Sequence, residues 1–585
     1  MIATILAATA LNAADAPRFI DPPASGPARV CMRRHETHPR WSYSTVGVAS
    51  DLSEFQWLVQ SPHTGDVWID ADEMITGSRE TGVVFVRHGG RFWRVNVRER
   101  SAAMLDARPQ GALQVRGHGV AISQMAGRGN RLEVADLDSD SVTRFDAGVR
   151  FTQVMSGWSF DHDAPVVIVA SQHGRADEGA HHQADVFSLD GEPLAQVRSD
   201  DLETLWRPYH SNGAVLALSR PDEWLCPVWV GQDGVGAPAA ECSRDMSDVW
   251  LDAEGQIVDM QAYHLNSDAS AGAVHGWPMA GFAGAADVAM DGSRAEWILT
   301  DGLPRLTFHS VDGEGAIPVN SPCSVNPPVR IGREITASSS DGLTVHGFLH
   351  LPEGEPKALV VTLHGGPYAA SSRHDSFHAD RLVPYGYAVL DTNVRGSLGY
   401  GRAYMEAGFG LTLDAQADDA EALAAAALAE WPDREIPVIL SGESWGGMPA
   451  ITAASKRDTP FDALVLAVAT CRFPTVPGLG RLPGPEAGVT PNNPAFARLL
   501  WRYSSEIGAD DDLCGVALNP DLPVLSIIAG REDRIPYGTI NALKEANPDT
   551  PWTEWQLPNA GHTLPNYIHG PMFSERLDEL LESLR

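Results

Sequence analysis

Short apolar runs closed by turn residues fill the first half of the chain. Between about residues 40 and 325, runs such as GVVFVRHGG, RFWRVNV, APVVIVAS and AEWILTDG end in polar or glycine turns and show no long helical period. GWSFDHDAPVVIVAS and VAMDGSRAEWILTDG share a turn, a pair of apolar strand residues and a polar end, as in a degenerate blade repeat. The pattern predicts an all-β propeller, whose length of about 290 residues corresponds to six or seven blades of roughly 40 to 50 residues.

The pattern changes near residue 330, after the proline-rich SPCSVNPPVR. Runs that read as buried strands, such as KALVVTLHGG, YAVLDTNVRG, IPVILSGES and PVLSIIAG, now alternate with segments of helical spacing such as LDAQADDAEALAAAALAEW and FSERLDELLESLR. This order predicts a mostly parallel sheet with helices on both faces and a site at the carboxyl ends of its strands. We therefore expect a propeller domain over residues 17–330 and an α/β domain over 331–585.

Composition and charge narrow the choice of partners. The chain has 585 residues and is 43% hydrophobic, which is enough for more than one core. Its 43 basic and 76 acidic residues give a formal net charge of −33, which repels nucleic acid and anionic membranes. No apolar run reaches the roughly 18 residues that a membrane-spanning helix needs. We expect no nucleic-acid partner and no membrane span, and we leave a homo-oligomer open.

The N-terminus resembles a secretory signal peptide. IATILAATALNAA is an apolar run of about 13 residues, and Ala14 to Ala16 has the small-x-small form that signal peptidase accepts. The charged start of a signal is missing, since the first basic residue is Arg18. We expect residues 1–16 to direct export to the periplasm or the exterior. The alternative is a cytoplasmic protein whose apolar N-terminus docks on the fold.

Six cysteines, an even number, also favour an oxidising compartment. Three disulfides are consistent with their spacing, and six buried thiols are the alternative. The candidate pairs are Cys226–Cys242, Cys471–Cys514 and Cys31–Cys323.

The stretch SGESWGG has the form of a nucleophile elbow. Gly442, Ser444 and Gly446 match G-x-S-x-G between the strand-like IPVIL and an alanine-rich segment. A turn this sharp requires small residues beside the nucleophile, and it lifts the hydroxyl to the N-terminus of the next helix. Backbone N–H groups and the helix dipole can stabilise an oxyanion there. An ordinary glycine-rich turn is the alternative, but strand, turn and helix together favour an α/β-hydrolase fold.

VVTLHGGPY supplies the second half of an oxyanion site. Gly365 and Gly366 follow an apolar strand, where glycine allows close approach to a substrate carbonyl, and we expect His364 to support this loop. In this fold the serine, the acid and the histidine follow in chain order. NAGHTL places His562 in a polar loop between the strand-like TEWQL and the C-terminal helix, so His562 is the predicted base. His569 lacks this context, and a surface histidine is the alternative for His562.

Together these motifs resemble a known family. ITASSSDGLTVHGFLHLPEG, LHGGPY, NVRGSLGYG, GESWGG, REDRIP and AGH are similar to the catalytic domain of prolyl oligopeptidase family serine peptidases, nearest the acylaminoacyl-peptidase and dipeptidyl-aminopeptidase-like branch. The resemblance covers about residues 331–585, and the first half is similar only in size, position and composition. It implies a propeller of about seven or eight blades above an α/β-hydrolase domain, which restricts cleavage to short peptides because folded proteins cannot reach the site.

The resemblance also implies a role for individual residues. It makes Ser444 the nucleophile, His562 the base, the Gly366 and Trp445 backbone N–H groups the oxyanion hole, and Arg534 and Tyr368 substrate-binding residues. An arginine at this place would hold a main-chain carbonyl of the substrate near the scissile bond. Two stretches depart from the family pattern, CRFPTVPGLGRLPGPEAGVTPNNPAFARLLWRYSS and GLTLDAQADDA, so the substrate preference stays open.

Two adjacent acids compete for the third place in the triad. Counting from Gly530 by the usual G-x-x-D spacing gives Asp533. Matched as one ungapped block from Pro523, PVLSIIAGREDRIP corresponds to the family form PLLLIHGxxDDRVP, with Ala529 where a glycine usually stands and Glu532 where the aspartate stands. We expect Glu532 to orient the base, with Asp533 as the alternative. A pair of surface charges beside an arginine is the structural alternative.

The resulting hypothesis is a serine peptidase that hydrolyses short peptides through an acyl-enzyme. A carboxylesterase or other acyl hydrolase would use the same triad, although it has little use for a large β domain. A catalytically inactive propeller-hydrolase that serves as a binding module is the alternative from another class. We expect no metal or nucleotide cofactor, because H-E-x-x-H and dinucleotide spacings are missing and His181 and His182 in EGAHHQAD are predicted to lie in a solvated turn.

Overall fold

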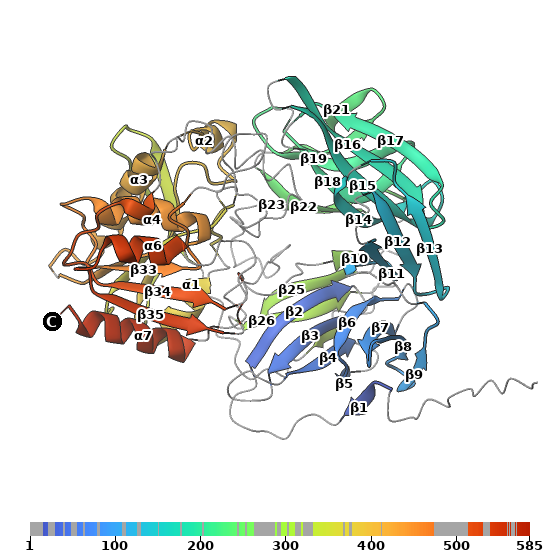
Figure 1. The fold of residues 1–585 in the computed structure, drawn as a ribbon, viewed down its shortest axis with the longest axis horizontal. Coiled ribbons are helices and arrows are strands. Elements are labelled where there is room, and N and C mark those ends of the chain that lie inside the picture. Colours follow the sequence, from blue (N-terminus) through green and yellow to red (C-terminus); the bar gives the residue numbers. More distant parts are fainter. Residues whose placement is uncertain are drawn as a thin grey trace, which may run out of the picture.

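The protein, described here by a computed structural model, consists of a ring of β-sheets and an α/β body that lie side by side (Figure 1). The structure describes the chain except for residues 1–15, 21–29, 48–54, 263–286, 310–316, 320–331, 473–512, 531–538 and further stretches of up to five residues. Among the helices it describes, none is both long and apolar enough to cross a membrane.

Six sheets, mostly antiparallel, form the ring within the described residues. The first has the order β1-β5-β4-β3-β2, and the next two follow the chain order β6 to β9 and β10 to β13. Their strands are β1 (Arg18–Ile20), β2 (Val30–His38), β3 (Trp41–Gly47), β4 (Phe55–Ser61), β5 (Gly65–Asp70), β6 (Glu73–Gly77), β7 (Val83–His88), β8 (Arg91–Asn96), β9 (Ser101–Met104), β10 (Leu113–Gly117), β11 (Val120–Gln124), β12 (Arg131–Asp136) and β13 (Ser141–Asp146).

The fourth sheet has eight strands because two four-stranded groups join through a short parallel pairing of β14 with β18. Two smaller sheets, β22-β23 and β24-β25-β26-β27, complete the described ring. The strands are β14 (Phe151–Ser159), β15 (Ala164–Arg175), β16 (Glu178–Ser188), β17 (Pro193–Ser199), β18 (Leu205–Ser211), β19 (Ala214–Ser219), β20 (Cys226–Gly231), β21 (Gly234–Pro238), β22 (Met246–Leu251), β23 (Ile257–Ala262), β24 (Asp287–Val288), β25 (Arg294–Thr300), β26 (Leu303–His309) and β27 (Ile317–Val319).

Successive side chains of a strand point to opposite faces of its sheet, and this alternation explains why the sheets stack into a ring. On β7, Val84 and Val86 pack against the first sheet, whereas Phe85 between them packs against the third. On β15, Val167 and Val169 likewise face the third sheet. Each sheet therefore buries both faces against its two neighbours, which is the packing of propeller blades. The predicted propeller is confirmed.

The C-terminal body is an eight-stranded sheet of order β28-β29-β31-β30-β32-β33-β34-β35. The pairs from β31 to β35 are parallel, whereas β28-β29 and β29-β31 are antiparallel. The elements are β28 (Arg333–Ser338), β29 (Thr344–His350), β30 (Leu359–Leu363), α1 (Phe377–Leu382), η3 (Val383–Tyr385), β31 (Ala388–Asn393), α2 (Arg402–Glu406), α3 (Leu413–Leu428), β32 (Val438–Glu443), η4 (Ser444–Gly446), α4 (Gly447–Ser455), β33 (Ala463–Ala467), η6 (Leu513–Gly515), β34 (Val524–Ala529), α6 (Thr539–Ala546), β35 (Trp552–Leu557) and α7 (Gly570–Glu582).

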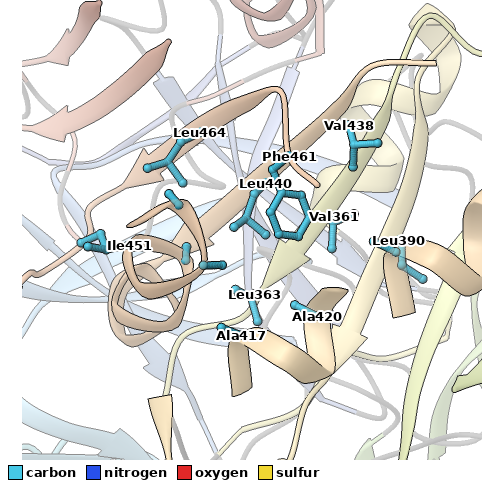
Figure 2. Close-up of a cluster of buried hydrophobic side chains, with 14 of the residues drawn as sticks. Val361, Leu363, Leu390, Ala417, Ala420, Val438, Leu440, Ile451, Phe461 and Leu464 are labelled. Atoms are coloured by element: carbon cyan, nitrogen blue, oxygen red, sulfur yellow. The ribbon is translucent and has the colours of Figure 1, made fainter. Parts of the chain in front are cut away.

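Helices cover both faces of this sheet, as predicted for an α/β-hydrolase fold. On one face, Val361 and Leu363 of β30 pack with the alanine-rich α3 and with α4 (Figure 2). Val360, directly before Val361, faces the opposite cluster, which contains residues of α1 and α7. Alternate side chains of one strand thus serve two hydrophobic layers, and this fixes the strand in the middle of the sheet.

Two of the predicted disulfides are present in the described residues. Cys226 is bonded to Cys242 with a Cα–Cα distance of 6.0 Å, and Cys471 to Cys514 with a Cα–Cα distance of 4.9 Å. Cys323 of the third predicted pair lies outside the described residues. The Cys471–Cys514 bond joins the segment after β33 to η6 and so closes the chain that carries residues 473–512.

The prediction of a solvated turn at His181 and His182 is wrong. Both residues lie in β16, where His182 is 4% exposed and the His181 ring stacks on His173 of β15 at a centroid distance of 5.2 Å. The polar run EGAHHQAD therefore forms part of a long strand, held by pairing with β15 and β17 rather than by its own apolar pattern.

A buried histidine gives the α/β body a specific sensitivity to acid. His378 of α1 is 7% exposed, and its Nε2 lies 3.5 Å from the Ser441 hydroxyl of β32. Burial lowers the pKa of His378 to about 4, while Asp391 acts in the raising direction and Arg381 in the lowering direction. The folded protein therefore holds this ring neutral in a pH range where the unfolded chain would protonate it.

We expect the free energy of unfolding to decrease as the pH is lowered, because of His378. Since the pKa of His378 is about 4 in the fold and about 6.5 when unfolded, stability is lost as pH falls from 6.5 to 4, by about 3 kcal/mol in total. The loss levels off below both values. Urea unfolding of the α/β body at pH 7, 5.5 and 4.5 should show a shallower pH dependence in His378→Gln than in the parent.

The matched control is His162→Gln, which changes an exposed histidine of the propeller. Because His162 lies in the propeller, where its neighbour is His210, this variant should keep the parental pH dependence of the unfolding of the α/β body. A parental slope in His378→Gln would contradict the assignment of the acid sensitivity to His378, whatever the variant's stability at pH 7, because the comparison uses slopes and not absolute values.

Candidate active site

The chain makes a sharp turn at Ser444, between β32 and α4. Ser444 has a φ of 53°, in the left-handed region that residues with a side chain adopt rarely. The strand ends at Glu443, and the helical segment begins at once with η4. The turn therefore sets the hydroxyl at the carboxyl end of a central strand and beside the first backbone N–H groups of a helix.

Gly442 and Gly446 leave no space for a side chain around this turn. A Cβ on Gly442 would lie 2.5 Å from the Gly446 carbonyl oxygen and 2.7 Å from the Ala450 Cβ. A Cβ on Gly446 would overlap the Leu363 carbonyl oxygen at the end of β30. The glycines of the G-x-S-x-G pattern are thus required by the close approach of β30, β32 and α4.

His562 meets Ser444 across 118 residues of sequence. Its Nε2 lies 3.0 Å from the Ser444 Oγ, which is hydrogen-bond distance for a hydroxyl that donates to a neutral imidazole nitrogen. His562 follows β35 and Ser444 follows β32, so both come from carboxyl ends of parallel strands in one sheet. The structure therefore brings together the two residues that the sequence selected as nucleophile and base.

The glycine loop after β30 lies against the elbow. A Cβ placed on Gly365 would be 3.1 Å from the Ser444 Cβ, and Gly366 has a φ of 135°, which favours glycine. Trp445, directly after Ser444, is buried. The predicted oxyanion loop and Trp445 thus both lie next to Ser444.

His364 supports this loop and is held away from a role as base. Its Nδ1 lies 2.7 Å from the Gly365 carbonyl oxygen and its Nε2 lies 2.8 Å from the Ser397 Oγ. Because a carbonyl oxygen can only accept, Nδ1 carries the proton in the neutral ring. Burial, the largest effect, lowers the pKa of His364, so the ring is neutral and both nitrogens are engaged in the fold.

Four of the predicted site residues lie outside the described residues: Tyr368, Glu532, Asp533 and Arg534. The strand that leads to the acid pair is described. β34 ends at Ala529, parallel to its neighbours β33 and β35. A Cβ on Gly530 would lie 2.5 Å from the Pro558 carbonyl oxygen, in the segment that leads to His562. The chain therefore enters residues 531–538 at the sheet edge where Ser444 and His562 meet.

Glu443 is a site residue that the sequence reasoning missed. It immediately precedes Ser444 and is partly buried. Burial raises the pKa of Glu443, and the nearby His562 acts in the opposite direction, which means that the carboxyl group and the imidazole are electrostatic neighbours. The signal was present in GESWGG, where an acid occupies the variable position before Ser444.

The described residues contain no group of three or more histidine, cysteine or acidic side chains placed to hold a metal ion.

Comparisons with known proteins find similarity to peptidases. A family model described as "Serine aminopeptidase, S33" matches residues 354–495. Dipeptidyl aminopeptidase BIII of Pseudoxanthomonas mexicana is 30% identical over 137 residues, which are 22% of this chain and 20% of that protein. An uncharacterised peptidase of Bacillus subtilis is 26% identical over 266 residues, or 43% of this chain and 38% of that protein. These matches span well under half the length of either curated relative.

The similarity in structure extends over almost the whole chain. The acylaminoacyl peptidase of Pyrococcus horikoshii superposes with a TM-score of 0.64 at 14% sequence identity, covering 94% of this chain and 98% of that one. At this identity the likeness concerns the fold: a propeller followed by an α/β-hydrolase domain. The resemblance of the motifs to prolyl oligopeptidase family serine peptidases is consistent with every one of these comparisons.

Proposed function

We propose that this protein is a serine peptidase that hydrolyses short peptides through an acyl-enzyme. The observation that carries the proposal is the 3.0 Å contact between His562 Nε2 and Ser444 Oγ at a strained strand-to-helix turn. Ser444 is the nucleophile, His562 the base, Glu532 the acid that orients the base, and the backbone N–H groups of Gly366 and Trp445 form the oxyanion hole.

Two proton transfers through His562 connect the steps. Nε2 takes the Ser444 proton as Oγ attacks the scissile carbonyl carbon, and the carbonyl oxygen becomes an oxyanion that accepts the two backbone N–H bonds. His562 then gives this proton to the leaving amine, and the C–N bond breaks. A water attacks the acyl-enzyme in the same way, with its proton taken by His562 and returned to Ser444.

A peptide substrate is supported by the similarity of the chain to peptidases, and the two domains are in contact. The backbone N–H of Gly399 in the α/β body donates to the Asp245 carboxylate of the propeller over 2.9 Å, so the propeller is part of the surroundings of the catalytic body. We assign the domain boundary to residues 330 and 331, between β27 and β28. Arg534 and Tyr368 complete the proposal as substrate-binding residues.

Export is part of the proposal. It is supported by the predicted signal over residues 1–16, by β1, which begins at Arg18 directly after it, and by the two disulfides, which form in oxidising compartments. The intact mass of protein purified with its own N-terminus tests whether residues 1–16 are removed.

A substrate panel tests the peptidase proposal. We expect turnover of at least one of three anilide classes, aminoacyl, dipeptidyl or N-acetyl-aminoacyl, at a rate blocked by a fluorophosphonate. The amide bond needs the leaving-group proton that His562 supplies, whereas an activated nitrophenyl ester does not, so the two substrate types separate a peptidase from a weaker acyl hydrolase.

The other outcomes of the substrate panel would support the alternative functions. Turnover of nitrophenyl esters alone would replace the peptidase assignment by a carboxylesterase. No turnover together with no fluorophosphonate labelling of the folded protein would favour a binding module. The anilide class that is hydrolysed fastest identifies which end of a peptide the site recognises.

A further inference from the structure

The segment at residues 397–399 contacts both the glycine loop and the propeller. Ser397 Oγ lies 2.8 Å from His364 Nε2, at the start of the glycine loop, and the Leu398 N–H donates to the Ala369 carbonyl over 2.9 Å, at its end. The next N–H, that of Gly399, donates to Asp245 of the propeller over 2.9 Å. Three consecutive residues therefore contact both ends of the glycine loop and one buried carboxylate of the propeller.

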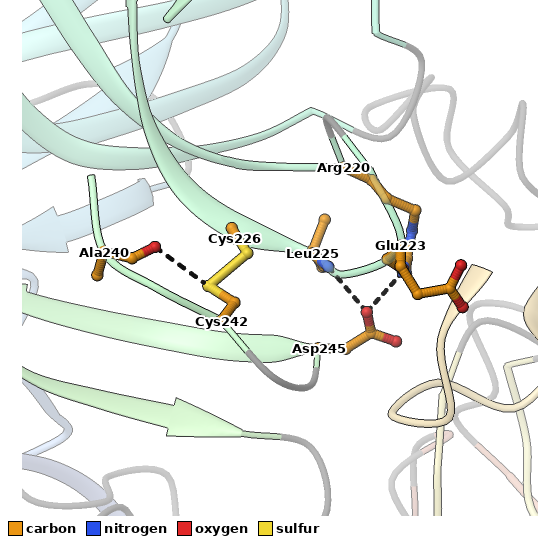
Figure 3. The surroundings of a disulfide bond; sticks show 7 residues. All are labelled: Arg220, Glu223, Leu225, Cys226, Ala240, Cys242 and Asp245. Atoms are coloured by element: carbon orange, nitrogen blue, oxygen red, sulfur yellow. Dashed lines mark hydrogen bonds and ion pairs between the residues drawn. A yellow bond between two sulfur atoms is a disulfide. The ribbon is translucent and has the colours of Figure 1, made fainter. Parts of the chain in front are cut away.

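The Asp245 carboxylate is buried and fixed by hydrogen bonds. The residue is 0% exposed, and its Oδ1 accepts the Arg220 guanidinium at 2.6 Å and the Leu225 backbone N–H at 2.8 Å (Figure 3). The other oxygen, Oδ2, is the acceptor for Gly399. A carboxylate that is completely buried is tolerated only when its oxygens are satisfied, so the Gly399 N–H is a required partner of Asp245.

A second set of bonds at the same interface does not involve the 397–399 segment. Arg402 of α2 donates through Nε to the Asp222 carbonyl over 3.0 Å and through Nη2 to the Arg220 carbonyl over 2.7 Å. Its backbone N–H donates to the Glu223 carbonyl over 3.1 Å. These bonds dock α2 on the propeller, and they provide a matched comparison for the Asp245 contact.

The packing behind the glycine loop is incomplete. A cavity of about 10 Å³, the size of roughly one water molecule, lies behind it and is lined by residues that include His364, Ser397 and Gln416. The Gln416 Oε1 is buried there and accepts no hydrogen bond from the residues that the structure describes. On this side of the loop His364 is in contact with the Ser397 Oγ, which also bonds to the Val394 carbonyl oxygen.

We propose that Asp245 is a positioning residue for catalysis: through Gly399 it fixes the 397–399 segment, and through Ser397 and His364 it sets the oxyanion loop. The inference rests on the proposed function of Ser444 and Gly366. It makes catalytic competence of the α/β body dependent on the docked propeller. A donor displaced by a fraction of an ångström from the oxyanion weakens transition-state binding more than substrate binding.

Asp245→Asn is the informative variant. The single oxygen of the asparagine amide can still accept from Arg220 and Leu225. Its NH₂ group then faces the Gly399 N–H, so the hydrogen bond between residue 245 and Gly399 is lost. We expect kcat on the best anilide to fall by about 10- to 100-fold, below the roughly 10²- to 10³-fold cost of deleting an oxyanion donor, with KM within about threefold. The Ki of a peptide aldehyde, which forms an oxyanion on Ser444, should rise in proportion, while product binding stays unchanged.

Two further variants keep the test decisive. Ser397→Ala breaks the contact on the catalytic side without touching the propeller, and it should show the same loss in kcat. The double variant should be no worse than the more impaired single variant, because both act through one segment. Arg402→Ala weakens the same interface away from that segment and should retain parental kcat.

The inference is overturned if Ser397→Ala keeps parental kcat, if Asp245→Asn folds and keeps it, or if Arg402→Ala loses as much as Asp245→Asn. Should Asp245→Asn not fold, Ser397→Ala and Arg402→Ala still decide between these outcomes. Failure of the proposed function is distinct, since the parent protein would then show no turnover that depends on Ser444.

Discussion

Ser444→Ala should lower the turnover of short peptide anilides by about 10⁶, because removal of a triad nucleophile leaves only binding and the oxyanion hole. The hydroxyl is the group that His562 contacts at 3.0 Å, and no other atom of residue 444 can form the acyl bond. The same variant should lose all reaction with a fluorophosphonate. Both quantities are measured on protein whose thermal unfolding matches that of the parent.

Ser455→Ala is the matched control for this experiment. Ser455 ends α4, and its hydroxyl donates to the Thr452 carbonyl, away from the elbow. This variant should be labelled and should turn over substrate as the parent does. Labelling of Ser444→Ala at another serine, or a loss of only tenfold, would mean that the nucleophile lies elsewhere.

Much of the fold follows from local periodicity. Runs such as VVFVRH and PVVIVAS alternate side chains toward two neighbouring blades, and they form β7 and part of β15 as predicted. Strand order does not follow from such patterns. β31 lies between β29 and β30, and β28-β29 is an antiparallel hairpin at the sheet edge, because pairing depends on contacts between segments far apart in sequence.

The polar strand β16 shows the limit of the same reasoning. EGAHHQAD carries few apolar residues, so its pattern favours a turn, yet its backbone pairs on both sides. Tertiary pairing here overrides local propensity.

Some residues of the candidate site can be predicted from the sequence, and others only from the folded structure. Ser444, His562 and the glycine loop could be selected because each belongs to a short motif whose chemistry requires those residue types, and the structure brings them together. Asp245 belongs to no such motif. It is separated from Gly399 by 154 residues and lies in the other domain, so only the folded arrangement reveals the bond.

Glu532→Gln should lower turnover by about 10⁴, and Asp533→Asn should have a small effect. The acid of a triad holds the tautomer of its histidine and stabilises the imidazolium that forms when the serine proton is taken, so its neutral amide loses both functions. The acid must reach the Nδ1 side of His562, since Nε2 faces Ser444. Turnover of the best anilide, measured for both variants under identical conditions, checks this expectation.

The choice of Glu532 rests on register. The block from Pro523 to Pro536 matches the family form without a gap, and β34 begins at Val524, directly after the first proline. A one-residue deletion would have to be absorbed between two prolines of fixed φ, whereas exchanging aspartate for glutamate only lengthens the side chain by one methylene. A 10⁴ loss in Asp533→Asn with near-parental Glu532→Gln would reverse the assignment and would leave Ser444 and His562 in their proposed roles.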